Sequence, residues 1–188
     1  MKRFYTTLIF LITFFVVENS QAQMRYGNCG SASTDRFYIT PYIGAGFATY
    51  KTPNLKDNTF TWLGGITFQY RFFDKVKLGL GARYQEYTKP KYQHIKPYLN
   101  AEFSLYFTEF EDFGLFINAG PAFDINIIDV SGVFIDGGIY FNYLVTPNTG
   151  LVFMLDYSHN KLNFPSGLSI SEFKINELKL SIGYRFWF

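Results

Sequence analysis

The side chains whose types and spacing could do chemistry in this chain are charged residues at every second position of otherwise apolar stretches. The cations on these faces include Lys77 and Lys96, and the network that we predict consists of Arg71, Arg83, Glu102, Asp124, Asp136, Asp156, Lys179 and Arg185. Alternate positions share one face of a β-strand, and charges removed from water have to be paired. The pattern therefore predicts a buried network of ion pairs, with a narrow path for water or ions as the functional alternative.

Two pairings within this network can be suggested from the sequence. Arg83 and Glu102 fall at similar heights on neighbouring stretches and form the best candidate ion pair. Asp124 and Asp136 are expected to face each other, and a hard cation such as Ca²⁺ prefers carboxylate oxygens. Because two carboxylates without a ligand-rich loop are a weak metal signal, partnership with Lys179 or Arg83 is the preferred prediction. No metal or other cofactor is expected.

A single stretch, Tyr157 to Glu172, combines residue types found in hydrolytic sites and reads YSHNKLNFPSGLSISE. It resembles the end of the lipid A deacylase barrels, in which a His and a Ser two residues later work with a downstream acid. The resemblance implies His159 as the base and Glu172 as the acid. At the position of the nucleophile this chain has Lys161, and Ser158 falls on the other face of a strand. Without a hydroxyl beside the imidazole there is no acyl transfer by that route, so His159 is predicted to be a rim histidine at the water interface.

The elements that must position these side chains are β-strands, as the last stretch, Leu178 to Phe188, shows. Every second residue from Leu178 onward is apolar, whereas the positions between include two cations and two small residues. A repeat of two residues predicts a strand, and a transmembrane β-strand needs ~9–11 residues that alternate in this way. One face would therefore meet hydrocarbon and the other a polar interior.

This ending resembles the C-terminal strand of bacterial outer-membrane β-barrel proteins, in which a terminal Phe follows apolar residues at alternate positions. The matching residues are Ile182, Tyr184, Phe186 and Phe188. The resemblance implies that they form the signal read by the barrel-insertion machinery, which would then be a partner. It specifies a class of membrane protein and not an activity.

The same alternation recurs in seven earlier stretches separated by turn residues. These stretches are Arg36–Tyr50, Phe60–Phe72, Val76–Tyr87, His94–Phe107, Phe113–Asn126, Gly132–Leu144 and Gly150–Asn160. Pro41 removes one ladder donor from the first of them. Eight strands in succession can close a sheet and leave no edge, as lipid requires. The sequence therefore predicts an all-β fold, an eight-stranded antiparallel up-and-down transmembrane β-barrel over residues 36–188, with interior room for side chains and little else.

The connections between the predicted strands sort by length. Those after the second, fourth and sixth strands are short, whereas Lys51–Thr59, Thr88–Gln93 and Lys161–Glu172 are longer and the link near Asp129 is an exception. Outer-membrane barrels have short periplasmic turns, long external loops and both termini in the periplasm. Part of an aromatic girdle near the periplasmic rim would then consist of Phe72, Phe107, Phe113, Tyr143 and Phe186.

The N-terminal residues have the features of an export signal. Lys2 and Arg3 precede the apolar run Leu8 to Val17, and Ser20-Gln21-Ala22 is a small-x-small cleavage site, so residues 1–22 are predicted to be a signal peptide. The run is shorter than the ~20 residues of a transmembrane helix. Residues 23–35 are predicted to be a flexible periplasmic leader, in which the single cysteine, Cys29, is a free thiol.

Composition supports a membrane barrel and excludes some functions. Aromatic residues make up 21% of the 188 residues, and the formal net charge of +2 gives no polybasic surface for nucleic acid. The chain resembles the OmpA transmembrane domain and OmpX in architecture. This resemblance implies a monomer in the outer membrane of a Gram-negative bacterium, with outer-membrane lipids as partners and an external partner that the sequence does not identify. The expected role is non-enzymatic, structural or surface-interacting; a lipid A-modifying enzyme and a narrow pore are the alternatives.

Overall fold

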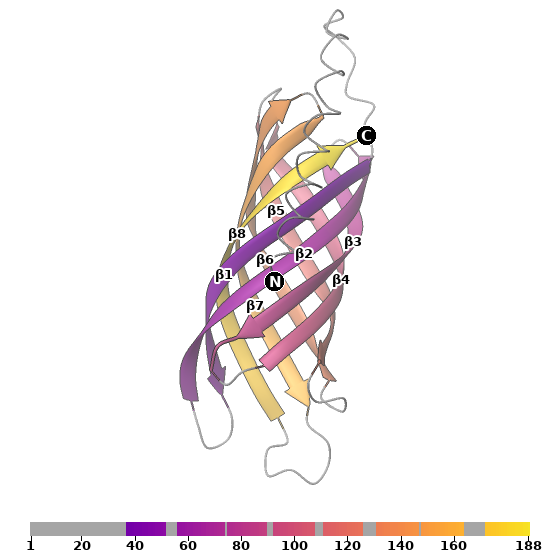
Figure 1. The fold of residues 1–188 in the computed structure, drawn as a ribbon. Coiled ribbons are helices and arrows are strands. Elements are labelled where there is room, and N and C mark those ends of the chain that lie inside the picture. The colour runs from indigo at the N-terminus through magenta and orange to yellow at the C-terminus, as the bar shows by residue number, and fades with distance from the viewer. Residues whose placement is uncertain are drawn as a thin grey trace, which may run out of the picture. The chain divides into compact units, whose positions relative to one another are not determined.

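The computed structural model describes residues 37–51, 56–73, 75–89, 92–107, 111–125, 131–146, 148–163 and 172–188. They form eight strands: β1 (Phe37–Lys51), β2 (Lys56–Phe73), β3 (Val76–Tyr87), β4 (Tyr92–Phe107), β5 (Glu111–Asp124), β6 (Ser131–Thr146), β7 (Thr149–Asn163) and β8 (Glu172–Trp187). Each strand pairs antiparallel with the next, and β8 pairs with β1 to close the barrel (Figure 1). The predicted eight-stranded up-and-down barrel is confirmed.

Some predictions concern residues outside these ranges. The signal peptide (1–22) and the leader (23–35), which contains Cys29, lie outside the described residues. Within the described ranges, no helix has the length and apolar character needed to cross a membrane.

Side-chain exposure alternates along the strands as the sequence pattern predicts. In β1, Ile43 and Phe47 are 67% and 73% exposed, whereas Tyr38 and Tyr42 are only 4% and 8% exposed. Large apolar side chains cover the outside of the other strands in the same way. Soluble proteins rarely expose contiguous apolar surface on this scale, but a barrel wall surrounded by lipid requires it.

The strands are longer at one end of the barrel than the alternation of apolar residues predicts. β2 begins at Lys56 and β8 at Glu172, so the predicted loops Lys51–Thr59 and Lys161–Glu172 shrink to the connections 52–55 and 164–171. In these extensions the outward residues become polar, as at Lys56 and Lys174, while inward residues such as Phe173 stay buried. Strand pairing therefore continues beyond the apolar band.

The connections now sort by length without the exception that the sequence suggested. We call the end with connections 52–55, 88–91, 125–130 and 164–171 the loop end, and the end with 74–75, 108–110 and 147–148 the turn end. β6 begins at Ser131 and β5 ends at Asp124, so the fifth connection belongs with the longer ones. The C-terminal residue Phe188 lies at the turn end, where its backbone N–H donates to Phe37 O over 3.0 Å.

Prolines interrupt two of the eight seams between strands. The β4–β5 ladder has the rungs Ile95–Phe123 and Leu99–Ala119 but none between them, and this register places Pro97 directly opposite Pro121. Neither proline has a backbone N–H to donate. Pro41 interrupts the β1–β8 ladder on one side only, in agreement with the missing donor predicted there.

Candidate functional site

The interior of the barrel is lined by charged side chains of both signs. The buried cations are Lys77, Arg83, Lys96, Lys179 and Arg185, and the buried carboxylates are Glu102, Asp112, Asp124, Asp136, Asp156 and Glu177. The two signs nearly balance among the described residues. Removing so many charges from water is tolerable only where each is paired or hydrogen-bonded, so the geometry of the pairs decides what the interior can do.

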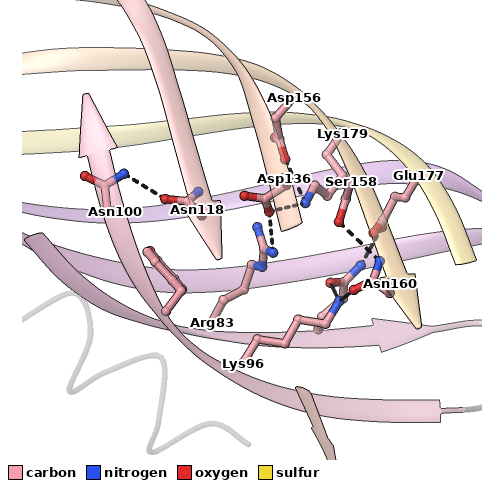
Figure 2. Close-up of polar contacts among 12 residues, drawn as sticks. Arg83, Lys96, Asn100, Asn118, Asp136, Asp156, Ser158, Asn160, Glu177 and Lys179 are labelled. Atoms are coloured by element: carbon pink, nitrogen blue, oxygen red, sulfur yellow. Dashed lines mark hydrogen bonds and ion pairs between the residues drawn. The ribbon is translucent and has the colours of Figure 1, made fainter. Parts of the chain in front are cut away.

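The central group joins β3, β6, β7 and β8 through the carboxylate of Asp136 (Figure 2). Arg83 Nη2 lies 2.6 Å and Lys179 Nζ 2.9 Å from Asp136 Oδ2. Lys179 Nζ also contacts Asp156 Oδ2 at 2.7 Å. The Arg83 guanidinium lies 5.2 Å from the ring centroid of Phe134, within the range of a cation–π contact. This group therefore crosslinks four strands inside the wall.

A second group lies toward the turn end. Arg185 Nη2 donates to Glu102 Oε1 over 2.8 Å, and Lys77 Nζ forms an ion pair with Asp112 and lies 3.6 Å from Glu102 Oε2. The hydroxyl of Tyr140 donates to Asp112 Oδ1 over 3.0 Å. Two cations and two carboxylates thus share their hydrogen bonds in one fully enclosed cluster.

A third group lies toward the loop end and is built around Glu177 and Lys96. Thr61 Oγ1 and Gln85 Nε2 both donate to Glu177 Oε1 over 2.5 Å. Lys96 Nζ donates to Gln85 Oε1 over 2.7 Å and to Asn160 Oδ1 over 2.6 Å. In Figure 2 the side chain of Lys96 extends toward Asn160. The amide of Gln85 therefore bridges the carboxylate and the ammonium.

Apolar side chains fill the barrel beyond this third group, at the loop end. Tyr50 stacks on Phe173 with ring centroids 5.4 Å apart, and Tyr92 meets Phe173 edge-on at 5.7 Å. They belong to a buried cluster with Tyr87 and Ile175, which are each 1% exposed. The apolar cluster closes off the polar groups from the loop end.

One small cavity lies among the polar groups. A cavity of ≈ 20 Å³ lies beside Arg83, Asn100, Asn118 and Asp156. Each ordered water needs about 10–15 Å³ of such volume and two or more polar partners, so the cavity holds about one water. Its amide lining is itself bonded, because Asn100 Nδ2 donates to Asn118 Oδ1 over 2.7 Å.

The two pairings suggested from the sequence are wrong. The β3–β4 register places Glu102 opposite Lys77, and it places Arg83 opposite Lys96, so Arg83 and Glu102 are well separated along the wall. Asp136 lies opposite Asn118 rather than Asp124. The preferred partners of Asp136, Arg83 and Lys179, are the ones that the structure shows.

Asp124 and Arg71 occupy different surroundings from the rest of the predicted network. Asp124 lies across from His94 on β4, with Asp124 Oδ2 3.5 Å from His94 Nε2. The Arg71 guanidinium lies 5.1 Å from the ring centroid of Tyr38. In the described part of the chain, no group of three or more His, Cys, Asp or Glu residues could hold a metal ion.

Sequence reasoning missed Asp112 and Glu177 because both lie near strand ends. Asp112 was assigned to a turn, and Glu177 precedes the apolar alternation of the last predicted strand. The sequence does contain a signal for both residues, because each lies two positions from an inward residue. Asp112 is two positions from Gly114, and Glu177 is two positions from Lys179. Continuing the period of two past the apolar band would have found them.

The surroundings of His159 match those of a rim histidine. The ring is exposed on the outer face, and Nδ1 lies 2.7 Å from Asn176 Oδ1. Ser158 is fully buried inside the barrel, and Lys161 is exposed on the same side as His159. The side chain of Glu172 lies outside the described residues. Among the described residues, no hydroxyl and imidazole form a nucleophile–base pair here.

Of the four residues of the predicted insertion signal, Ile182, Tyr184 and Phe186 face outward on β8, and Phe188 directly follows the strand. Ile182 and Phe188 are 43% and 63% exposed, and the rings of Tyr184 and Phe186 meet edge-on at 5.0 Å. In the predicted aromatic girdle, Phe72 and Tyr143 are exposed at the turn end, and Phe113 and Phe186 are half-buried there. The side chain of Phe107 lies outside the described residues.

Comparison with known proteins supports the fold but identifies no specific function. No protein-family profile and no curated protein sequence matches the chain. Neisserial surface protein A is similar in structure, with a TM-score of 0.55 and 16% identity over 81% of this chain and 97% of its own. The outer membrane protein OprG from Pseudomonas aeruginosa has a TM-score of 0.51 and 14% identity, over 82% of this chain and 96% of its own. AlkL, an outer membrane protein studied in DMPC bilayers, has a TM-score of 0.55 and 8% identity, over 87% of this chain and 95% of its own. The chain has the fold of small outer-membrane β-barrels, a fold that hosts several functions.

Proposed function

We propose that this protein is a non-enzymatic, sealed β-barrel of the Gram-negative outer membrane, with a structural or surface-interaction role. The observation that carries the proposal is the interior: Asp136 binds both Arg83 and Lys179, and the two other charged groups are equally enclosed. A rigid wall of this kind provides a scaffold at its loop end. Loops on a rigid scaffold are where binding residues usually lie.

The filled interior favours a closed scaffold over a pore. An ion path would have to cross the stacked rings of Tyr50 and Phe173 and displace Lys179 from two carboxylates. Opening these contacts would leave buried charges unpaired, which costs several kcal/mol. The cavity of ≈ 20 Å³ beside Arg83 has room for about one water and not for a hydrated ion.

The first test measures ion conduction. We expect the refolded mature chain to give no stepwise conductance in planar lipid bilayers at low protein density. Heat-modifiable gel migration of the same sample establishes that the barrel is folded, and a porin in the same bilayer establishes that the assay detects open channels. Reproducible unitary steps from folded protein would contradict the sealed interior and support the pore.

A second prediction concerns Phe188 and delivery to the membrane. Phe188 is 63% exposed on the outside of the barrel and its bond to Phe37 uses only backbone atoms. Phe188→Ala should therefore cost refolded protein no more than the ~1.5–3 kcal/mol that one large apolar side chain contributes in an apolar medium. Assembly in cells should fall several-fold, since the terminal aromatic side chain is the proposed insertion signal. The measurement is the folded fraction in outer-membrane extracts.

The matched control is Phe47→Ala. Phe47 is 73% exposed on the outer face of β1, so its replacement removes the same apolar group far from the C-terminus. Equal assembly of the two variants in cells would show that Phe188 has no part in delivery.

A further inference from the structure

Lys77, Glu102 and Asp112 bring an amine and two carboxylates together inside the barrel, toward its turn end. Lys77 Nζ lies 2.5 Å from Asp112 Oδ2 and 3.6 Å from Glu102 Oε2. The three residues come from β3, β4 and β5, and all three side chains are buried. An amine and a carboxyl group can condense to an amide with loss of one water, so this cluster has the components of a covalent cross-link.

The Lys77–Asp112 pair is removed from water. Lys77 Nζ lies 5.4 Å from the ring centroid of Tyr38 and 5.1 Å from that of Tyr140, and charge enclosed in this way loses the stabilisation that water gives. Transfer of one proton from Nζ to Asp112 Oδ2, along the hydrogen bond that already joins them, gives an uncharged amine and an uncharged carboxylic acid. These are the forms that react with each other, because a protonated amine has no lone pair to donate.

Two further groups are placed to stabilise charge and to move protons during this reaction. The hydroxyl of Tyr140 donates to Asp112 Oδ1 over 3.0 Å, and Oδ1 is the oxygen that becomes negative when Nζ attacks the carboxyl carbon. A donor already in place at such an oxygen lowers the barrier. Glu102 Oε2 faces Nζ at 3.6 Å, and its other oxygen is held by Arg185 Nη2 at 2.8 Å. Glu102 is therefore positioned to carry a proton to and from the reacting atoms.

We propose that Lys77 and Asp112 become joined by an isopeptide bond, which the folded chain forms without another enzyme. Nζ of the uncharged lysine attacks Cγ of the protonated carboxyl group, and Oδ1 takes the negative charge beside the Tyr140 hydroxyl. Glu102 Oε2 accepts a proton from the now positive nitrogen and passes it to the Oδ2 hydroxyl group, which leaves as water while the Oδ1 carbonyl forms again. An N–C bond has then replaced a C–O bond, and Glu102 is again a carboxylate.

The fold supplies both the geometry for this step and a place for the released water. Groups held with their reacting atoms about 3–3.5 Å apart react far faster than the same groups free in solution, and Cγ of Asp112 lies one bond beyond Oδ2. The cavity of ≈ 20 Å³, which has room for about one water, is lined by Glu102 and Arg185 among others. The water that leaves Asp112 can therefore be accommodated next to the site.

The bond would tie β3 to β5 across the strand that lies between them. Lys77 lies opposite Glu102 on β4, and Asp112 is the second residue of β5, so the cross-link closes a covalent ring that contains the whole of β4. A ring of this kind restricts the unfolded chain, as a disulfide does, and thereby stabilises the folded state.

A peptide map of wild-type protein tests the proposal. The mature chain is recovered unfolded from inclusion bodies, refolded, denatured again and digested with chymotrypsin, which cuts after Phe73, Leu78, Phe110 and Phe113. The fragments 74–78 and 111–113 contain Lys77 and Asp112. We expect refolded protein to give a branched fragment that joins the two and is lighter than their sum by the mass of one water. Fragmentation in the mass spectrometer distinguishes Lys77 from Lys75 as the linked residue, and the chain before refolding should give separate fragments.

The rate at which the branched fragment appears after refolding tests the role of Glu102. Glu102→Gln should slow its formation by at least about 100-fold, the lower range for loss of a positioned proton carrier. Glu177→Gln is the matched control, because it makes the same replacement at another buried carboxylate, and it should leave the rate unchanged. Heat-modifiable migration checks that each variant is folded. If Glu102→Gln does not fold, Tyr140→Phe carries the kinetic test and should slow the reaction by about 100-fold through loss of the donor to Oδ1.

Separate fragments from folded wild-type protein after prolonged incubation would overturn the bond, and so would a link from Lys77 to a different carboxyl group. Formation of the bond at the wild-type rate in Glu102→Gln would overturn the proton-carrying role of Glu102. The first of these results comes from wild-type protein alone and does not depend on the folding of any variant.

Discussion

Replacing Asp136 by alanine is expected to destabilise the folded barrel by about 3–5 kcal/mol, the cost of removing one partner from a buried ion pair. The carboxylate is fully buried and binds Arg83 Nη2 at 2.6 Å and Lys179 Nζ at 2.9 Å. Lys179 keeps Asp156 at 2.7 Å, so the unpaired charge is mainly that of Arg83. The measurement is urea-induced unfolding in lipid vesicles, followed by tryptophan fluorescence.

Two further variants identify the cause of this loss. Arg83→Met/Asp136→Ala removes both charges and should recover most of the lost free energy, since apolar replacement of a whole buried pair is often neutral. Asp156→Asn leaves Lys179 with Asp136 and should cost less than Asp136→Ala. If the double variant is as unstable as Asp136→Ala, the carboxylate contributes through packing and not by pairing with Arg83.

Gly138→Ala is expected to weaken the barrel by at least about 3 kcal/mol, at or beyond the upper range for overpacking. Gly138 faces inward on β6, where β7 passes very close. A Cβ at this position would overlap the carbonyl oxygen of Leu155 and lie 2.6 Å from the Cα of Asp156. Because both neighbours are backbone atoms, the methyl group can be accommodated only if the two strands separate, which also disturbs the Asp156–Lys179 pair.

Gly64→Ala provides the matched control for the same unfolding experiment. Gly64 lies on β2, and the atom nearest to a Cβ there is Tyr42 O at 3.8 Å, an ordinary contact. The added methyl group should therefore change the free energy of unfolding by ~0.5 kcal/mol or less. Comparable losses in the two variants would mean that the chain resists alanine at these positions for reasons other than the approach of β7 to Gly138.

The faces of the strands could be predicted from the sequence, because in a strand the direction of a side chain follows from its position alone. Ile43 outside and Tyr42 inside are examples of this local rule. Partners inside the barrel depend on how neighbouring strands are shifted, which local alternation does not encode. This is why Arg83 was matched to Glu102 but lies beside Asp136.

The ends of the strands escaped prediction for a related reason. Strand signals were sought where apolar and polar residues alternate, but beyond the apolar band the outward residues are lysine, asparagine and threonine, as at Lys174 and Asn176. The inward residues Phe173 and Ile175 still pack on Tyr50 and its neighbours. The apolar cluster at the loop end therefore depends on paired strand that the sequence had assigned to loops.

Because of the opposed prolines on β4 and β5, the strength of strand pairing differs from place to place around the barrel. At the Pro97–Pro121 rung the wall lacks the donors for both hydrogen bonds, whereas the seam where the chain's two ends meet lacks only the donor of Pro41. Strands held by fewer bonds part with less work. Under lateral tension we therefore expect β4 and β5 to separate first, on the side of the barrel opposite the β1–β8 pairing. This point faces acyl chains rather than either aqueous compartment.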